Sequence, residues 1–115
     1  MFDSKIAVIG LGYVGLPLSI EFGKLFQTVG FDTKKSRVAE LKRGHDSGLE
    51  VTAEEFQRST MLTLTNDVSD IANCNIFIVT VPTPIDEYKQ PNLMPLITAS
   101  ETVGKVLQKG DTVIY

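Results

Sequence analysis

Two adjoining stretches, Lys5-Ile-Ala-Val-Ile9 and Gly10-Leu11-Gly12-Tyr13-Val14-Gly15, are the most informative part of this chain. The first is a short apolar run rich in β-branched residues, which is typical of a buried strand in a parallel sheet. The second fits the pattern Gly-x-Gly-x-x-Gly. An amphipathic helix is predicted over residues 13–26. Its apolar positions at helical spacing are Val14, Leu18, Phe22 and Leu25. A strand, a glycine turn and a helix in this order predict a dinucleotide-binding unit.

The three glycines of this turn have separate roles in the predicted site. Gly10 permits the tight turn, Gly12 lets a pyrophosphate approach the backbone, and Gly15 lets the helix pack against the strand. Free amides in the middle of the motif and the positive end of the helix would hold the phosphates. The residues between the glycines that complete this site are Leu11, Tyr13 and Val14. The alternative is a turn that only joins a strand to a helix, but three glycines at this spacing cost backbone entropy that a plain turn does not need.

Asp32 predicts which dinucleotide is bound. It follows Gly12 by 20 residues and closes a second short strand, Thr28–Phe31. A carboxylate there can accept both hydroxyls of the adenosine ribose and would repel a 2′-phosphate, so the sequence favours NAD over NADP. The alternatives for Asp32 are a solvated turn residue and the N-cap of a second helix, predicted over Lys34–Lys42.

Three cations follow Asp32 and weaken the exclusion of NADP slightly. Lys34 and Lys35 are expected on a solvated helix face, whereas Arg37 could pack its guanidinium against the adenine edge.

The remaining segments continue the alternation of strands and helices. Val38 and Leu41 are expected to face inward from the second helix. The later elements predicted are a capped helix over 53–59, a strand over 62–65, a helical turn over 68–72, a strand over 75–81, a helix from Pro95 to about Leu107 ended by Gly110, and a strand over 112–115. The predicted fold is therefore α/β, a doubly wound, Rossmann-type parallel sheet with helices on both faces. The chain stops within its fifth predicted strand, so we expect the front part of a longer protein.

Val81-Pro82-Thr83-Pro84 comes at the carboxyl end of the strand over 75–81, where ligands bind in open parallel sheets. The prolines fix the backbone on both sides of Thr83. Its hydroxyl and amide would then contact the phosphates or the nicotinamide ribose of the cofactor. A stiff loop that only caps the sheet is an equal alternative.

Composition excludes several other classes of function. The chain has 115 residues and a net charge of -3, which suits one domain and disfavours nucleic acid as a partner. The apolar runs are too short to cross a membrane, and the N-terminus shows no signal-peptide pattern, so a cytoplasmic protein is expected.

The isolated reactive residues do not suggest an active site. Cys74 is expected to be a small structural residue, because no histidine is near it in sequence. The single histidine, His45, lies in a polar loop, so neither a metal site nor a catalytic triad is predicted. Asp86 and Glu87 are adjacent and point apart, so they form no acid/base pair. We therefore expect a cofactor site with no catalytic residue in this chain.

Three motifs together resemble the N-terminal domain of the UDP-glucose/GDP-mannose dehydrogenase family. They are Ile9-Gly-Leu-Gly-Tyr-Val-Gly-Leu-Pro17, Gly30-Phe-Asp32 and Val79-Thr-Val-Pro-Thr-Pro84. Ile85–Leu93 is similar to the branch of bacterial UDP-N-acetylhexosamine 6-dehydrogenases that serve capsule and O-antigen synthesis. The resemblance covers nearly the whole chain. It implies oxidation of the sugar C6 alcohol to a carboxylate in two NAD-dependent steps.

The resemblance also implies which functions belong to this chain and which belong to the rest of the protein. In the family, cofactor contacts fall on positions that match Val14, Asp32, Arg37 and Thr83. The catalytic cysteine and lysine, the sugar-binding domain and the dimer helix would lie beyond this chain. Residues 1–115 would then be the NAD-binding domain of a homo-oligomeric dehydrogenase. They would meet the UDP-sugar through the missing C-terminal part and turn over nothing alone.

Two other functions stay open at this point. A regulatory Rossmann module would bind NAD without consuming it, and a methyltransferase-like domain would bind S-adenosylmethionine, because one fold hosts many functions.

Overall fold

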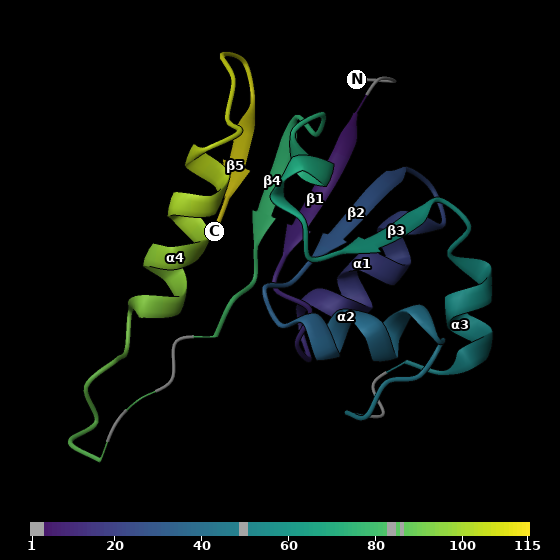
Figure 1. The fold of residues 1–115 in the computed structure, drawn as a ribbon, viewed down its shortest axis with the longest axis horizontal. Helices are drawn as coiled ribbons and strands as arrows, with labels where there is room; N and C mark the ends of the chain where they lie inside the picture. The colour runs from purple at the N-terminus through teal and green to yellow at the C-terminus, as the bar shows by residue number, and fades with distance from the viewer. Residues whose placement is uncertain (1–3, 49–50, 83–84, 86) are drawn as a thin grey trace.

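The strands of this chain form one parallel sheet in the order β3-β2-β1-β4-β5 (Figure 1). This computed structural model describes residues 4–48, 51–82, 85 and 87–115. The strands in that part of the chain are β1 (Lys5–Ile9), β2 (Gln27–Phe31), β3 (Leu62–Thr65), β4 (Ile76–Val79) and β5 (Thr112–Ile114). From β1 the chain proceeds outward to β2 and β3, whereas from β4 it proceeds to β5 on the opposite side. This reversal leaves a crevice at the carboxyl ends of β1 and β4, the place where doubly wound sheets bind ligands.

The helical segments pack on both faces of the sheet, as predicted. They are α1 (Gly15–Gly23), α2 (Lys35–Lys42), α3 (Ala53–Arg58), the short 3₁₀ helix η1 (Val68–Ile71) and α4 (Met94–Gly104). One hydrophobic cluster joins the sheet to η1 and α4, and a second cluster includes buried residues of α1 and α2. Side chains alternate between the two faces along each strand, so the central strand β1 is covered on both sides.

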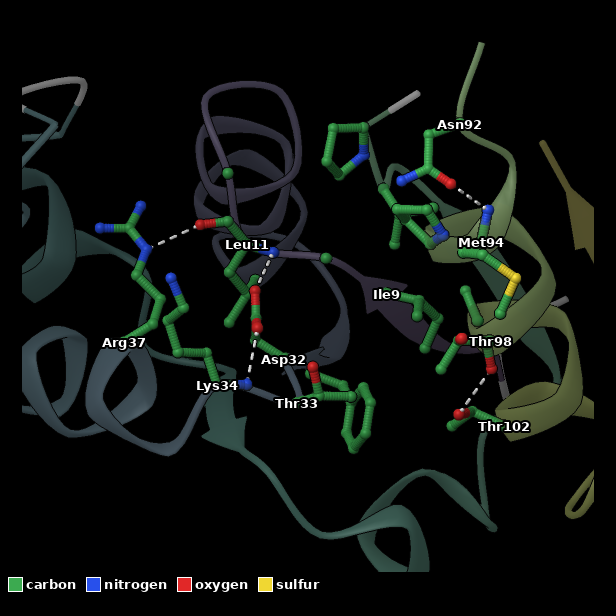
Figure 2. A pocket seen from close by; sticks show the side chains of 17 residues that line it. Ile9, Leu11, Asp32, Thr33, Lys34, Arg37, Asn92, Met94, Thr98 and Thr102 are labelled. Atoms are coloured by element: carbon green, nitrogen blue, oxygen red, sulfur yellow. Dashed lines mark hydrogen bonds between the residues drawn. The ribbon is translucent and has the colours of Figure 1, made fainter. Parts of the chain in front are cut away.

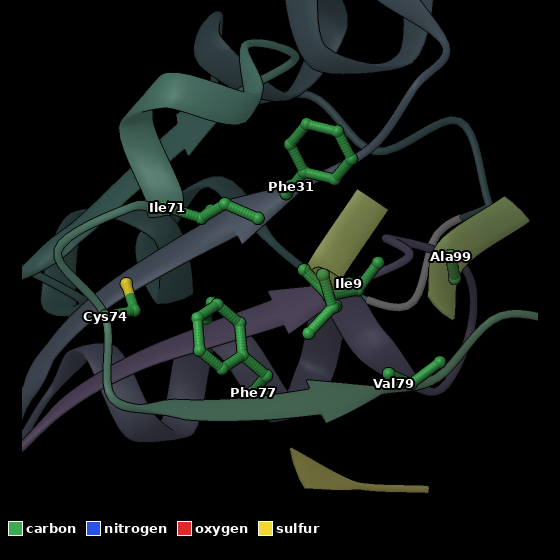
Figure 3. Close-up of a cluster of buried hydrophobic side chains, with 9 residues drawn as sticks. Ile9, Phe31, Ile71, Cys74, Phe77, Val79 and Ala99 are labelled. Carbon is green, nitrogen blue, oxygen red and sulfur yellow. The ribbon is translucent and has the colours of Figure 1, made fainter. Parts of the chain in front are cut away.

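The cluster under η1 and α4 contains the largest buried side chain, Phe77 (Figure 3). Ile9 and Phe31 contribute from β1 and β2, and Ala99 closes the cluster from α4. Because Ile9 and Phe31 are the last residues of their strands, this core extends up to the edge of the crevice. Packing therefore fixes the strand ends from which the site is built.

The cluster on the other face packs closely against a residue without a side chain, Gly30. A Cβ atom on Gly30 would lie 3.0 Å from a methyl group of Leu11 and 3.1 Å from one of Leu64. Leu11 is fully buried in this space, together with Leu16 of α1. The first residue after Gly10 is thus anchored in the core by its side chain, while its backbone remains at the crevice.

The prediction for the first helix was wrong in its bounds and in its buried face. The helix spans Gly15–Gly23, and its large buried side chains are Leu16 and Ile20. Val14 is 51% exposed and Leu25 is 71% exposed, since they lie outside the two ends of the helix. The face is set by glycine contacts at both helix ends, which hydrophobic spacing does not reveal. Leu18 and Phe22 are only partly buried.

Two further boundaries differ from the predictions. α4 ends at Gly104, and Gly110, with φ +94°, lies in the turn before β5 and does not end the helix. β4 is shorter than the predicted strand over 75–81, because Pro82 and the crevice loop follow closely. The predictions for α2 with Val38 and Leu41 inward, for β3, and for the capping box of Thr52 and Glu55 are confirmed.

Gly15→Ala is expected to destabilise the protein by about 3 kcal/mol or more, because steric overpacking of this kind is not relieved by side-chain rotation. The added Cβ would lie 1.8 Å from the carbonyl oxygen of Gly10 and 2.3 Å from the hydroxyl of Thr80. Urea unfolding measures the change. Gly104→Ala is the matched control, since a Cβ there meets nothing within 4 Å. A Gly15→Ala protein as stable as the control would contradict the close contact.

Candidate cofactor site

The glycine turn is held by three strands at once. Gly10 has φ +102°, and its amide donates to the carbonyl of Phe31 at 2.8 Å. The hydroxyl of Thr80, just beyond β4, donates to the carbonyl of Gly10 at 2.8 Å and lies 3.1 Å from that of Ile9. A left-handed backbone conformation at Gly10 and the missing side chain at Gly15 allow this arrangement. The end of β1 and the start of α1 are therefore in direct contact.

The N-terminus of α1 faces the crevice with free donors. Its N-cap, Val14, makes no side-chain cap, and no acidic residue occupies the first turn. Leu16 donates to the carbonyl of Gly12 at 3.0 Å. Within the described residues, the amides of Gly12, Tyr13 and Val14 have no hydrogen-bond acceptor. Helix N-termini of this kind bind phosphate, because the amides and the helix dipole both favour an anion.

Asp32 links the glycine turn to the second helix (Figure 2). Its Oδ2 accepts a hydrogen bond from the amide of Leu11 at 2.9 Å, and its Oδ1 accepts one from the amide of Lys34 at 2.9 Å. The N-cap of α2 is Lys34, which has no side-chain cap, so the alternative that Asp32 caps this helix is wrong. Asp32 is half-buried, and each oxygen keeps a lone pair for a ribose hydroxyl.

Arg37 holds the same turn from the other side. Its Nε donates to the carbonyl of Leu11 at 2.9 Å, and its Nη1 donates to Glu40 at 2.6 Å and to Asp46 at 2.8 Å. Burial alone would lower the pKa of the Arg37 guanidinium, but these two carboxylates raise the pKa above its ordinary value. The hydrogen bond from Arg37 in turn lowers the pKa of Glu40. The peptide groups on both sides of Leu11 are thus fixed by one anion and one cation.

These residues surround a cavity of about 590 Å³ at the carboxyl ends of the strands. This volume lies in the range of small-molecule sites. Six of the ten predicted residues line it, namely Gly10, Leu11, Gly12, Asp32, Arg37 and Pro82. Figure 2 shows Asp32 between the turn and Lys34, with α4 on the opposite side of the cavity. A Cβ on Gly12 would meet nothing within 4 Å, so this glycine is not required by the fold itself.

The other four predicted residues are placed differently. Tyr13 and Val14 line an adjoining hollow of about 460 Å³, which shares Gly12 and Pro82 with the main cavity. Gly15 is buried behind the turn. Thr83 lies outside the described residues.

The structure adds residues that the sequence reasoning missed. The start of α4 and the residues before it contribute Asn92, Met94 and Thr98 to the cavity wall. Asn92 accepts a hydrogen bond from the amide of Met94 at 3.0 Å (Figure 2). Glu40 and Asp46 were missed because they act through Arg37. The spacing of Arg37 and Glu40, one helical turn apart, was the available signal for an ion pair.

The isolated reactive residues play no part in this cavity. His45 is exposed, and the described part of the chain contains no cluster of metal-binding side chains. Cys74 is buried in the core beside Phe77, and burial raises the pKa of its thiol to about 11. None of the helices in the described ranges has the length and hydropathy that a membrane span requires.

Residues 4–115 match the family described as "UDP-glucose/GDP-mannose dehydrogenase family, NAD binding domain". The chain belongs to this family. NAD is accordingly the cofactor of this domain. The predicted family, fold class and cofactor are confirmed.

Named relatives support the same assignment. The chain is 60% identical over 115 residues to UDP-N-acetyl-D-glucosamine 6-dehydrogenase of Pseudomonas aeruginosa, covering 100% of this chain and 27% of that protein. It is 44% identical to Protein CapL of Staphylococcus aureus, covering 98% of this chain and 26% of that protein. The solved UDP-D-ManNAc dehydrogenase of Pyrococcus horikoshii superposes with a TM-score of 0.84 at 33% identity, covering 95% of this chain and 27% of that one. The chain thus spans about a quarter of the length of these relatives.

Gly12→Ala is expected to leave the stability of the protein within about 0.5 kcal/mol of the original, because the added methyl group meets open space. The same methyl group would stand where the pyrophosphate approaches, so we expect NAD affinity to fall at least about tenfold. Calorimetric titration with NAD measures the affinity. Retained affinity would mean that the pyrophosphate does not approach the backbone at Gly12.

Cys74 is expected to resist alkylation in the folded protein at pH 8. Cys74 is 4% exposed and its thiol has a pKa of about 11, so the reactive thiolate is scarce and hard to reach. Iodoacetamide labelling followed by peptide mapping should find Cys74 unmodified until denaturant is added. Rapid labelling without denaturant would show that the core around Phe77 opens readily.

Proposed function

We propose that this chain is the NAD-binding part of an enzyme that oxidises the C6 alcohol of a UDP-N-acetylhexosamine to the uronic acid. The observation that carries the proposal is the carboxylate of Asp32 beside the open backbone of Gly12 in one cavity of about 590 Å³. An adenosine ribose and a pyrophosphate need these two features side by side. The 60% identical relative named UDP-N-acetyl-D-glucosamine 6-dehydrogenase supports the substrate class.

Different residues of the proposed site bind different parts of the cofactor. The amides of Gly12, Tyr13 and Val14 at the N-terminus of α1 bind the pyrophosphate. Asp32 accepts the ribose hydroxyls, and Arg37 holds the Leu11 carbonyl so that the turn keeps its shape. Gly10, Leu11 and Gly15 shape this turn, while Pro82 and Thr83 are proposed to meet the nicotinamide half.

Bound NAD would accept the hydride in each of the two oxidation steps. The described residues of this chain position the cofactor, and the sugar and the catalytic side chains are assigned to the rest of the protein. Residues 1–115 are accordingly proposed as the NAD-binding domain of a longer dehydrogenase. We further propose that the intact protein is a homo-oligomer. It would work in the cytoplasm, in the synthesis of capsule or O-antigen polysaccharide.

The decisive assay uses the intact protein with NAD and UDP-N-acetylglucosamine. NADH absorbance should rise and reach two molecules of NADH per sugar, because alcohol-to-carboxylate oxidation removes two hydrides. Binding of NAD without any turnover of UDP-N-acetylhexosamines would favour the regulatory module. Preference for S-adenosylmethionine over NAD would reject the dehydrogenase.

Asp32→Ala is expected to lower NAD affinity by about tenfold and to narrow the preference for NAD over NADP. The variant loses the acceptor for the ribose hydroxyls and the charge that repels a 2′-phosphate. Parallel titrations with NAD and NADP measure both effects. Asp67→Ala is the matched control, because Asp67 also accepts from a backbone amide two residues ahead, at Ser69, but lies outside the cavity. Equal affinities in the Asp32 variant and the control would remove Asp32 from the site.

A further inference from the structure

Three cations that are close together in sequence lie at or near the proposed adenosine end of the crevice. Lys34 and Arg37 line the cavity, and Lys35 is exposed at the start of α2. A nearby arginine is the feature with which dinucleotide folds accept the 2′-phosphate of NADP. One aspartate, Asp32, lines the same cavity and accepts a hydrogen bond from the backbone amide of Lys34. Asp32 alone therefore leaves a local excess of positive charge, which would attract the phosphate that an NAD enzyme must reject.

Two further carboxylates neutralise the arginine of this group. Glu40 Oε1 lies 2.6 Å and Asp46 Oδ1 lies 2.8 Å from Nη1 of Arg37. The single charge of Arg37 is thus matched by two carboxylates. Because both carboxylates contact Arg37 directly, its guanidinium presents little net charge to the crevice.

The guanidinium is also fixed in position. Nε is engaged by the carbonyl of Leu11 and Nη1 by both carboxylates, so rotation toward a phosphate would break three hydrogen bonds. Asp46 is 3% exposed and accepts further hydrogen bonds from the amides of Gly48 and Val51. Glu40 in turn accepts from the hydroxyl of Ser47 at 3.0 Å. The two acceptors are thus held by the loop after α2, and they do not follow Arg37 if it moves.

We propose that Glu40 and Asp46 are specificity-determining residues, which hold and neutralise Arg37 so that its guanidinium cannot bind a 2′-phosphate, and which thereby favour NAD together with Asp32. The inference rests on the proposed NAD site and extends it to two residues that contact no part of the cofactor. The discrimination between NAD and NADP then depends on four charged side chains, namely Asp32, Arg37, Glu40 and Asp46. The dinucleotide fingerprint assigns it to Asp32 alone.

Glu40→Gln is the test variant, because it removes one charge, keeps the shape of the side chain and leaves Asp46 in place. Titrations of the intact protein with NAD and with NADP give the ratio of their dissociation constants. This ratio should shift toward NADP by about threefold to tenfold, the size expected for one partly exposed charge. The shift should shrink as salt is raised from about 0.05 to 0.5 M, because screening weakens the attraction of Arg37 for the phosphate.

Glu54→Gln is the matched control. Glu54 pairs with Arg58 at 2.6 Å on α3, so the variant makes the same change of charge and breaks a similar ion pair away from the cavity. The ratio should be unaffected in this variant. The double variant Glu40→Gln/Arg37→Gln should lose the shift toward NADP, since the freed guanidinium is its cause.

Three results would overturn the inference. One is a preference for NAD in the original protein that Glu40→Gln leaves unchanged, and another is a shift toward NADP that persists without Arg37. A third is an equal loss of affinity for both nucleotides, which would make Glu40 a support of the turn only. These results leave the proposed NAD site intact. An original protein that binds neither nucleotide would instead reject the proposed function together with the inference.

Discussion

The contact between Gly10 and Gly15 is the constraint on which the rest of the site depends. The carbonyl of Gly10 occupies the space where any other residue at position 15 would carry its Cβ, only 1.8 Å away. Because the strand end and the helix start meet without a side chain between them, the first amides of α1 face the crevice at the carboxyl end of β1. The exposure of these amides at the crevice, which suits an anion, thus follows from the absence of a side chain at Gly15.

A single residue, Leu11, connects this turn to the charges around it. Its side chain is buried against Leu16 and Gly30, its amide donates to Asp32, and its carbonyl accepts from Arg37. The apolar core therefore fixes the same residue whose backbone carries the polar contacts. Asp32 has one role that the structure shows and one that we propose, because it holds the turn through the Leu11 amide and would also present a carboxylate to the ribose. A loss of binding in a variant at this position combines both.

The sequence predicted the parts of this structure that depend on local pattern. The order of elements, the parallel sheet, the glycine turn and the inward residues Val38 and Leu41 all follow from periodicity and spacing. The buried face of α1 did not, because contacts of Gly15 with Gly10 and of Gly23 with Leu62 set it. Asp46 was also beyond reach, since a carboxylate in a polar loop shows no sign in sequence that it will be buried beside an arginine.

The hydrogen bond between Thr80 and Gly10 indicates when this site forms during folding. It joins residues 70 positions apart, and it can form only after β4 has docked beside β1. The unit β1-α1-β2 contains the whole glycine motif, yet it lacks the hydrogen bond from Thr80 while the later half of the sheet is unfolded. Long-range contacts of this kind form late in folding, because closing the intervening loop costs entropy. A nucleotide bound at the proposed site would therefore require the completed sheet, and its binding would stabilise the docked β4 together with the turn.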